Sequence, residues 1–152
     1  MLFRSRGRGG GRGENFEAVK IEHDKLIVEP TEKISKDGSQ LWRITSPCGV
    51  CIGNLKFTIP KGFEFDFASV PRFAKPMLSD LLLQSIAPAA HDYLYSIGQS
   101  KGVCDGAFLD LMRFIRVPLW QRVVATTAVS LFGWRAYNAH QRRLKRADCV
   151  RE

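Results

Sequence analysis

The stretch PKGFEFDFASVPR, residues 60–72, separates two kinds of sequence in this chain of 152 residues. Inside it, phenylalanines at every second position alternate with Glu64 and Asp66, which is the two-residue period of a half-buried strand. The aromatic rings are expected on one face of that strand and the two carboxylates on the other. Ser69 then supplies a helix N-cap with Pro71 in the first turn, so the period is expected to change from strand to helix here.

Short β-type segments separated by turn signals precede this boundary. Residues 18–30 predict one or two strands, residues 41–46 and 55–60 predict one each, and the Lys-Asp-Gly sequence at residues 36–38 predicts a turn. The N-terminal half is therefore expected to form a small antiparallel sheet.

Beyond residue 69 the apolar residues recur with the period of a helix. A first helix is expected to run unevenly from the Ser69 cap through residues 78–83, with an interruption at Pro76. Further helices are expected over residues 85–98, 102–115 and 118–146. Strands followed by helices indicate an α+β fold, in which a small antiparallel sheet packs against a layer of three to four helices.

The domain organisation follows from composition. Residues 15–146 predict a single α+β domain, which is large enough to bury a core without disulfides or metal. Residues 1–14 are rich in arginine and glycine and contain almost nothing to bury, so they predict a flexible arm. Residues 147–152 are expected to form a short C-terminal tail.

The net charge of +8 lies at the two ends of the chain. Of the 23 lysines and arginines, nine fall in residues 1–13 and 135–146, which contain no acid. The rest of the chain has the remaining 14 bases and all 15 acids, so its net charge is about −1. A nearly neutral body argues against a DNA-binding face on the folded core. The arm and the basic helix end instead predict contacts with acidic protein surfaces or nucleic acid, through Arg4, Arg6, Arg8, Arg12, Arg142, Arg143, Lys145 and Arg146.

Neither a secretory signal nor a membrane span is expected. The first 14 residues lack the apolar region of a signal peptide, so the chain is expected to be made in the cytoplasm. The longest apolar run, VVATTAVSLFGW at residues 123–134, is too short to cross a bilayer and predicts a buried core helix.

Four cysteines are present, and two of them, Cys48 and Cys51, have the Cys-x-x-Cys spacing. A zinc site would need a second ligand pair, and a redox dithiol would open a helix, whereas this pair precedes the Gly53-Asn54 turn signal. Two thiols in or near a hairpin turn are therefore the favoured interpretation, and their redox state stays open.

The helix IAPAAHDYLYSIG, residues 86–98, carries the densest chemistry. His91, Asp92 and Tyr95 lie three and four residues apart and share a face of this helix. The helix is otherwise small and apolar, so a histidine and a carboxylate there need partners. Asp66 on the upstream strand and Asp105 in the next helix are the expected partners, and Arg72 and Ser69 near the strand-to-helix boundary could join them.

Two interpretations of this cluster stay open. In the first, His91, Asp92, Asp105 and Asp66 form a hydrolase site in which His91 activates a water, and a divalent ion is held by His91, Asp66 and Asp105. In the second interpretation, the same groups only link the strand to the helices, and no cofactor is bound. We favour the second interpretation because structural ion-pair networks contain the same residue types as active sites. A triad through Ser69 is disfavoured because no nucleophile-elbow motif is present.

The ordered motifs DFASVPR, AAHDYLY, CDGAFLDLM and LFGW resemble an uncharacterised family of small bacteriophage and prophage proteins, described only as a domain of unknown function. The resemblance covers about residues 55–135. The motif residues of that family correspond to Asp66, Ala68, Ser69, Val70, Pro71, His91, Asp92, Leu94, Tyr95 and Asp105.

Two features depart from that pattern. The arginine-rich arm and the basic end of the last helix lie outside it. The family also has an arginine shortly before the later aspartate, where this chain offers Lys101 as the nearest base.

The resemblance implies a bacteriophage gene, and two functions follow as hypotheses. The first is a virion component of the tail, baseplate or neck, which docks on other virion proteins through its compact domain and basic arm. The second is a phage-borne hydrolase of cell-wall peptide or glycan centred on His91.

Overall fold

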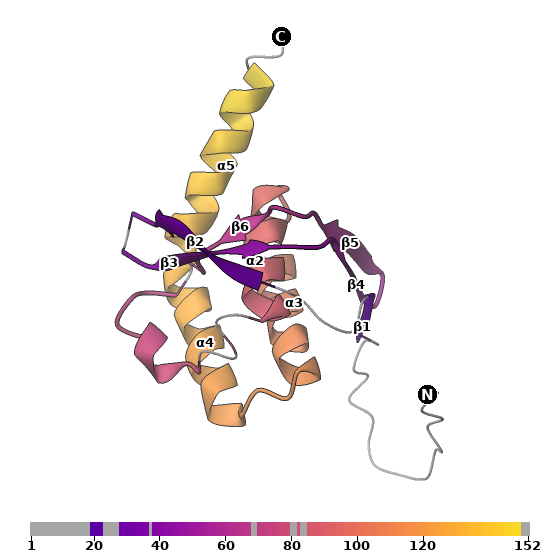
Figure 1. Ribbon diagram of the computed structural model, residues 1–152, viewed down its shortest axis with the longest axis vertical. Coiled ribbons are helices and arrows are strands. Elements are labelled where there is room, and N and C mark those ends of the chain that lie inside the picture. The colour runs from indigo at the N-terminus through magenta and orange to yellow at the C-terminus, as the bar shows by residue number, and fades with distance from the viewer. Residues whose placement is uncertain are drawn as a thin grey trace.

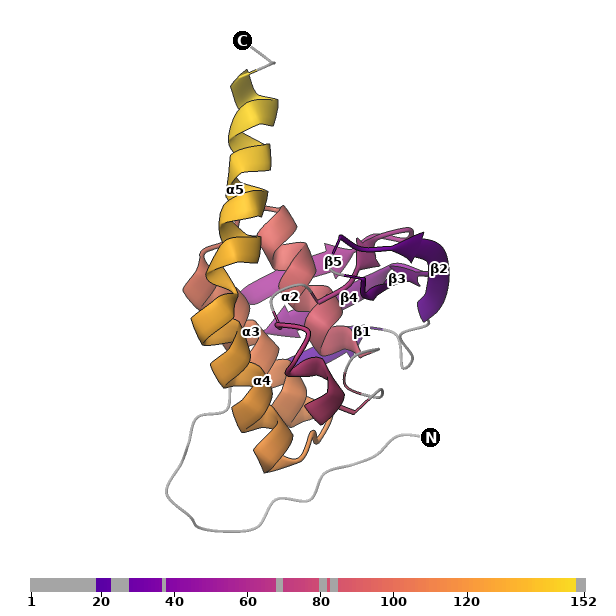
Figure 2. The ribbon, with the colours of Figure 1, turned by 90° about the vertical axis from the view of Figure 1, so that its left-hand side faces the viewer.

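The computed structural model describes residues 19–22, 28–36, 38–67, 70–79, 82 and 85–149. Two small antiparallel sheets come from the N-terminal half and a group of helices from the C-terminal half (Figure 1). Figure 2 shows the strands on one side of the molecule and the helices on the other. The predicted α+β fold is confirmed, although the strands are divided between two sheets.

The first sheet has the order β1-β4-β5, with β1 at Val19–Glu22, β4 at Cys48–Ile52 and β5 at Leu55–Ile59. The β4–β5 hairpin turns at Gly53, whose φ of 55° suits glycine, and Asn54. Cys48 and Cys51 belong to this hairpin, as expected, and both are free thiols. They lie inside strand β4 and not in the turn, because the turn needs only the two residues that follow Ile52.

The second sheet has the order β2-β3-β6, with β2 at Val28–Ile34, β3 at Gln40–Ile44 and β6 at Glu64–Phe65. Residues 18–30 therefore yield two strands, one in each sheet. The turn predicted at residues 36–38 joins β2 to β3, and Gly38 has a φ of 80°. Asp37 lies outside the described residues.

The aromatic strand is shorter than its alternation predicts. Only Glu64 and Phe65 pair with β3, and Phe67 adopts a left-handed φ of 56°. The side chains of Phe65 and Phe67 are nevertheless both buried, at 2% and 1% exposure. The strand ends early because the chain bends away to place the Phe67 ring against the helices.

The segment after this bend is less helical than predicted. Within it the structure describes a 3₁₀ helix, η1, at Lys75–Met77, and places Leu82 in a helical conformation. Pro71 and Pro76 remove two backbone N–H donors from this short segment, which limits how far a helix can extend. The predicted cap Ser69 lies outside the described residues.

Helices α2 (Ile86–Ser96) and α3 (Lys101–Phe114) match the predicted ranges closely. The Ser85 hydroxyl caps α2 by accepting from the N–H of Ala87, and the Ser100 hydroxyl caps α3 by accepting from the N–H of Val103. Gly98 ends α2 with a φ of 84°. Proline at the third position of α2 falls in the first turn, where its missing N–H costs nothing.

The last predicted helix is two helices, α4 (Leu119–Phe132) and α5 (Trp134–Cys149). They are separated by Gly133, which keeps helical dihedral angles while its N–H bonds to the Val129 carbonyl. Helix α5 extends three residues beyond the predicted end at Arg146. In both ribbon views α5 projects away from the rest of the domain.

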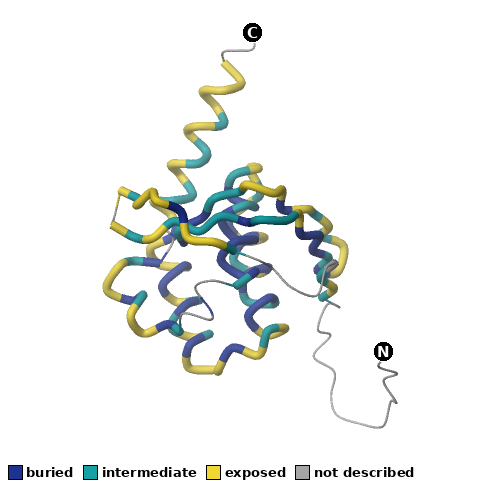
Figure 3. The backbone as a smooth tube through the Cα atoms, in the orientation of Figure 1, coloured by how far each residue is buried: buried dark blue, intermediate teal, exposed yellow. Residues whose placement is uncertain are grey.

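The expectation that residues 123–134 form a buried core helix is correct for one face of the helix only. Only Ala125, Ala128 and Val129 of this run belong to the core, and its large side chains include several that are exposed, as the burial colours of Figure 3 indicate for α4 and α5. Among the described residues, no helix combines the length and apolar character that crossing a membrane requires.

One core joins both sheets to the helices. It contains Ile44, Val50 and Ile59 from the strands and large apolar residues of α2 and α3, including Leu94, Phe108, Leu111 and Met112. Alanines at positions 87, 89 and 90 are fully buried, so α2 packs closely on its neighbours. His91 is placed at the centre of this core.

Gly133 is needed at the α4–α5 junction. A Cβ added there would lie 2.4 Å from the Val129 carbonyl oxygen and 3.1 Å from the hydroxyl of Tyr95. We expect Gly133→Ala to lower the free energy of unfolding by about 1–3 kcal/mol, because backbone must shift to admit the methyl group. The matched control is Gly106→Ala on α3, where nothing lies within 4 Å and a gain of about 0.5–1 kcal/mol is expected. Denaturant unfolding that shows the two variants equally stable would contradict this reading of Gly133.

Candidate functional site

His91 is fully buried and is held from two sides. Its Nε2 lies 2.9 Å from Asp105 Oδ1, across the interface between α2 and α3. The rings of Phe67, Tyr95 and Phe108 surround the imidazole, with centroids 6.0, 4.3 and 5.4 Å away. The predicted pairing of His91 with Asp105 is therefore present in the structure.

Asp92 has a different partner from the one that catalysis would require. Its Oδ2 accepts a hydrogen bond of 2.9 Å from the backbone N–H of Phe67. Its Oδ1 lies 3.7 Å from Nδ1 of His91, which is an ion-pair distance and leaves that buried nitrogen without a hydrogen bond. Asp92 thus fixes the left-handed backbone of Phe67 to α2 while facing the imidazole.

Lys101 completes the cluster, and the sequence prediction did not include it. Its ammonium group pairs with Asp105 Oδ2 and donates to the Val129 carbonyl at 3.1 Å. It also lies 5.4 Å from the centre of the Trp134 ring. The signal in the sequence was its position four residues before Asp105 on one predicted helix.

We call the side chains of His91, Asp92, Tyr95, Lys101 and Asp105 the buried polar network. Tyr95 enters it through its hydroxyl, which is 3.4 Å from Asp105 Oδ1. The network ties the end of β6, through the Phe67 backbone, to α2, α3 and the Val129 carbonyl of α4. The side chains of His91 and Lys101 are nearly inaccessible, at 0% and 8% exposure, and that of Asp105 is partly buried at 19%.

The network shifts the pKa values of its acid and base in opposite directions. Burial of the imidazole opposes a charge, but hydrogen bonding and attraction from Asp105 and Asp92 outweigh it and raise the pKa of His91 above 6.5. Burial opposes the charge of Asp105 as well, but His91 and Lys101 outweigh it and lower the pKa of that carboxyl. Up to about pH 6.5, the favoured state is therefore a protonated histidine beside an ionised aspartate, which is an ion pair and not a free base.

The folding stability should therefore depend on pH in a bell-shaped way. The raised pKa of His91 adds stability that is complete below pH 6.5 and is lost as pH rises through the folded-state value. The lowered pKa of Asp105 adds stability that is present above pH 3.8 and is lost as pH falls further. We expect the midpoint of thermal unfolding to be highest between these limits.

A comparison with the variant His91→Gln tests whether His91 causes the loss of stability at high pH. His140 acts in the opposite sense, because burial lowers its pKa and its contribution is lost as pH falls. The difference in unfolding midpoint between the protein and His91→Gln, measured from pH 5 to pH 9, removes the contribution of His140. That difference should shrink as pH rises, and a constant difference would contradict the charged state of His91.

Asp66 and Arg72, two further residues of the predicted site, come from the segment that follows β6. Asp66 is half-buried and its backbone carbonyl accepts from Nζ of Lys75 at 3.1 Å. Arg72 is exposed and lies near Gly38 instead of near His91. In the part of the chain that the structure describes, no three His, Cys, Asp or Glu side chains are gathered as a metal site. The ligand set of Asp66, His91 and Asp105 stays a prediction.

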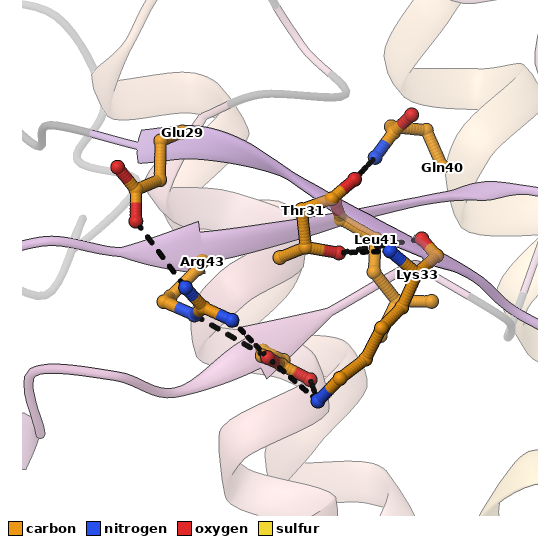
Figure 4. A network of polar contacts seen from close by, with 7 residues as sticks. Glu29, Thr31, Lys33, Gln40, Leu41 and Arg43 are labelled. Atoms are coloured by element: carbon orange, nitrogen blue, oxygen red, sulfur yellow. Dashed lines mark hydrogen bonds and ion pairs between the residues drawn. The ribbon is translucent and has the colours of Figure 1, made fainter.

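A second polar network lies on the outer face of the β2-β3-β6 sheet (Figure 4). Arg43 on β3 pairs with Glu64 at 2.8 Å and with Glu29 at 3.5 Å, and Lys33 pairs with Glu64 at 3.2 Å. These cross-strand pairs fix the register of a short sheet. They are exposed ion pairs, each of which contributes little to stability.

The predicted basic contacts are divided between described and undescribed residues. Arg142, Arg143, Lys145 and Arg146 are all exposed on the projecting helix α5, which has no buried residue. The predicted contacts of the arm, Arg4, Arg6, Arg8 and Arg12, lie outside the described residues. Helix α5 carries five bases and one acid, and it touches the domain through half-buried residues such as Tyr137 and Leu144.

The sequence matches the model of a known protein family. A family model described as "protein of unknown function (DUF1353)" matches residues 42–129, which is more than half of the chain. The chain belongs to the DUF1353 family. No curated protein and no solved structure matches it.

The DUF1353 match contains the whole buried polar network. It begins in β3 and ends at Val129, whose carbonyl accepts from Lys101. The α5 helix with its basic residues lies outside the DUF1353 match, as does the arginine-rich N-terminal segment.

Proposed function

We propose that this DUF1353 protein is a small virion component of a bacteriophage, associated with the tail, baseplate or neck. It docks on larger structural proteins through its compact domain and through basic segments at its ends. Support comes from the resemblance of residues 55–135 to small bacteriophage and prophage proteins. A docking protein needs a rigid body with exposed recognition surfaces, and the domain has both.

The burial of the polar network carries this proposal. A catalytic imidazole must reach its substrate, whereas the His91 ring is 0% exposed and its Nε2 is occupied by Asp105. Asp92 and Lys101 are committed to backbone groups of Phe67 and Val129. These groups hold the strands and helices in one arrangement. Contacts with a partner protein would therefore be made by exposed residues and not by the buried polar network.

Helix α5 is the surface that we assign to docking on an acidic partner. Its basic side chains are exposed, and the acidic residue nearest to them in sequence is Asp148. A helix projecting from the domain can insert between neighbouring subunits of a particle. Opposite charge on the partner would orient such an encounter and increase its rate.

The test is complementation of a phage or prophage that carries the gene. In the test variant, Arg142, Arg143, Lys145 and Arg146 are changed to glutamate, and we expect the chain to be lost from purified particles and infectivity to fall at least tenfold. The control changes the exposed Lys20, Lys36, Lys56 and Lys61 to glutamate, which alters net charge equally away from α5. Particles that lack the unmodified protein altogether would refute the proposal.

One observation favours a hydrolase as the second candidate. The buried Nδ1 of His91 has no hydrogen-bond partner, and imidazole–carboxylate pairs recur in acid–base catalysis. For this candidate, His91→Gln should abolish cleavage of cell-wall peptide or glycan while the fold survives, and a divalent ion should increase that cleavage. An unmodified protein that cleaves neither substrate, with or without divalent ions, would exclude it.

A further inference from the structure

Helix α4 carries an exposed face without charge. Along it Trp120, Val123, Thr127, Leu131 and, just beyond Gly133, Trp134 follow one another at intervals of three, four, four and three residues. Such spacing places them on one side of a helix. All five are exposed, and the four apolar members are 54–65% exposed. No charged residue occurs between Arg122 and Arg135.

We propose that this face, which we call the α4 stripe, binds the α4 stripe of a second copy of the chain in antiparallel orientation. The intervals are symmetric about Thr127. A two-fold axis at that residue therefore sets Trp120 opposite Trp134 of the second copy, and Val123 opposite Leu131. A surface that matches itself under a two-fold axis is the requirement for a closed homodimer.

The exposed area is sufficient for such a dimer. Leu119 borders the α4 stripe and is 67% exposed. With ~150–250 Å² for a fully exposed large side chain, the stripe and its border offer about 600 Å² on each copy. Burying both copies removes about 1,200 Å² from water, the lower limit for specific interfaces.

Charge selects the antiparallel orientation. The bases of α5 follow the α4 stripe at its C-terminal end, and residues 111–147 contain no acid to neutralise them. A parallel pair would bring two basic α5 helices side by side, where like charges repel. An antiparallel pair sends them in opposite directions, while the centre of the interface stays uncharged. This inference is independent of the proposed function, because it concerns the purified protein alone.

The experiment measures the mass of the full chain by sedimentation, under reducing conditions because Cys149 is exposed. We expect a dimer at micromolar concentrations. Val123→Lys and Leu131→Glu should each weaken it about 30-fold or more, as central interface residues do. Their thermal unfolding should match that of the unmodified protein at concentrations too low for it to dimerise, because both side chains are exposed. The matched control is Thr58→Lys on β5, an exposed residue far from α4 in sequence, and it should dimerise normally.

Mixing variants tests the orientation. Val123→Lys mixed with Leu131→Glu should restore the dimer as a heterodimer, because position 123 faces position 131 of the second copy. Val123→Lys mixed with Val123→Glu should stay monomeric. Recovery in the second mixture alone would overturn the antiparallel register. An unmodified protein that stays monomeric, or that instead binds anionic vesicles through α4, would overturn the proposal.

Discussion

Replacing Asp105 by asparagine is expected to lower the free energy of unfolding by about 3–5 kcal/mol, the range found when one partner of a buried ion pair is removed. The carboxylate accepts from Nε2 of His91 and pairs with the ammonium group of Lys101. Asparagine has nearly the same shape but no charge. Two buried cations would then lose their common counter-charge.

Chemical denaturation of Asp105→Asn measures this loss. Asp110→Asn on the same helix is the control, since Asp110 forms a pair of 3.4 Å with Arg113 at the surface and should change stability by less than about 0.5 kcal/mol. Equal effects at the two positions would mean that Asp105 is no more important than a surface acid. The double variant Lys101→Met with Asp105→Asn should recover part of the loss, because one buried cation is removed with its partner.

The second large effect is expected at Asp92. Asp92→Ala removes the acceptor for the N–H of Phe67 and one of the two carboxylates beside His91. We expect a loss of about 2–4 kcal/mol, because a buried donor is left unsatisfied at a strained, left-handed residue.

Asp92→Asn separates the two causes. Its amide oxygen can still accept from Phe67, so a loss much smaller than that of Asp92→Ala would assign the effect to the hydrogen bond. Equal losses would assign it to the charge facing His91. Unfolding measured at pH 5, where His91 is charged, gives the clearest comparison.

Local signals predicted much of this fold. Serine before a helical run predicted the start of α2, and glycine predicted its end, because capping and left-handed geometry depend on neighbours in sequence. The pairing of His91 with Asp105 was also predictable, since an isolated histidine in an apolar helix requires a partner. The division into two sheets was not, because it depends on which strands pair across the chain.

Other differences come from tertiary structure. The alternation around Phe65 predicted a longer strand, but burying the Phe67 ring against Phe108 required a bend. Residues 123–134 were expected in the core on hydrophobicity alone, which does not distinguish a core from an uncovered surface. Lys101 was overlooked because lysines are rarely buried, and only the nearby Asp105 and the Val129 carbonyl make its burial favourable.

The projecting helix α5 has a dynamic consequence. Its residues beyond Leu144 have no neighbours to bury, so opening their backbone costs only the helix's own weak cohesion. In deuterated water their amide protons should exchange within seconds, while those of α2 and α3 persist for hours. The C-terminal end of α5 can therefore change its conformation until a bound neighbour orders it.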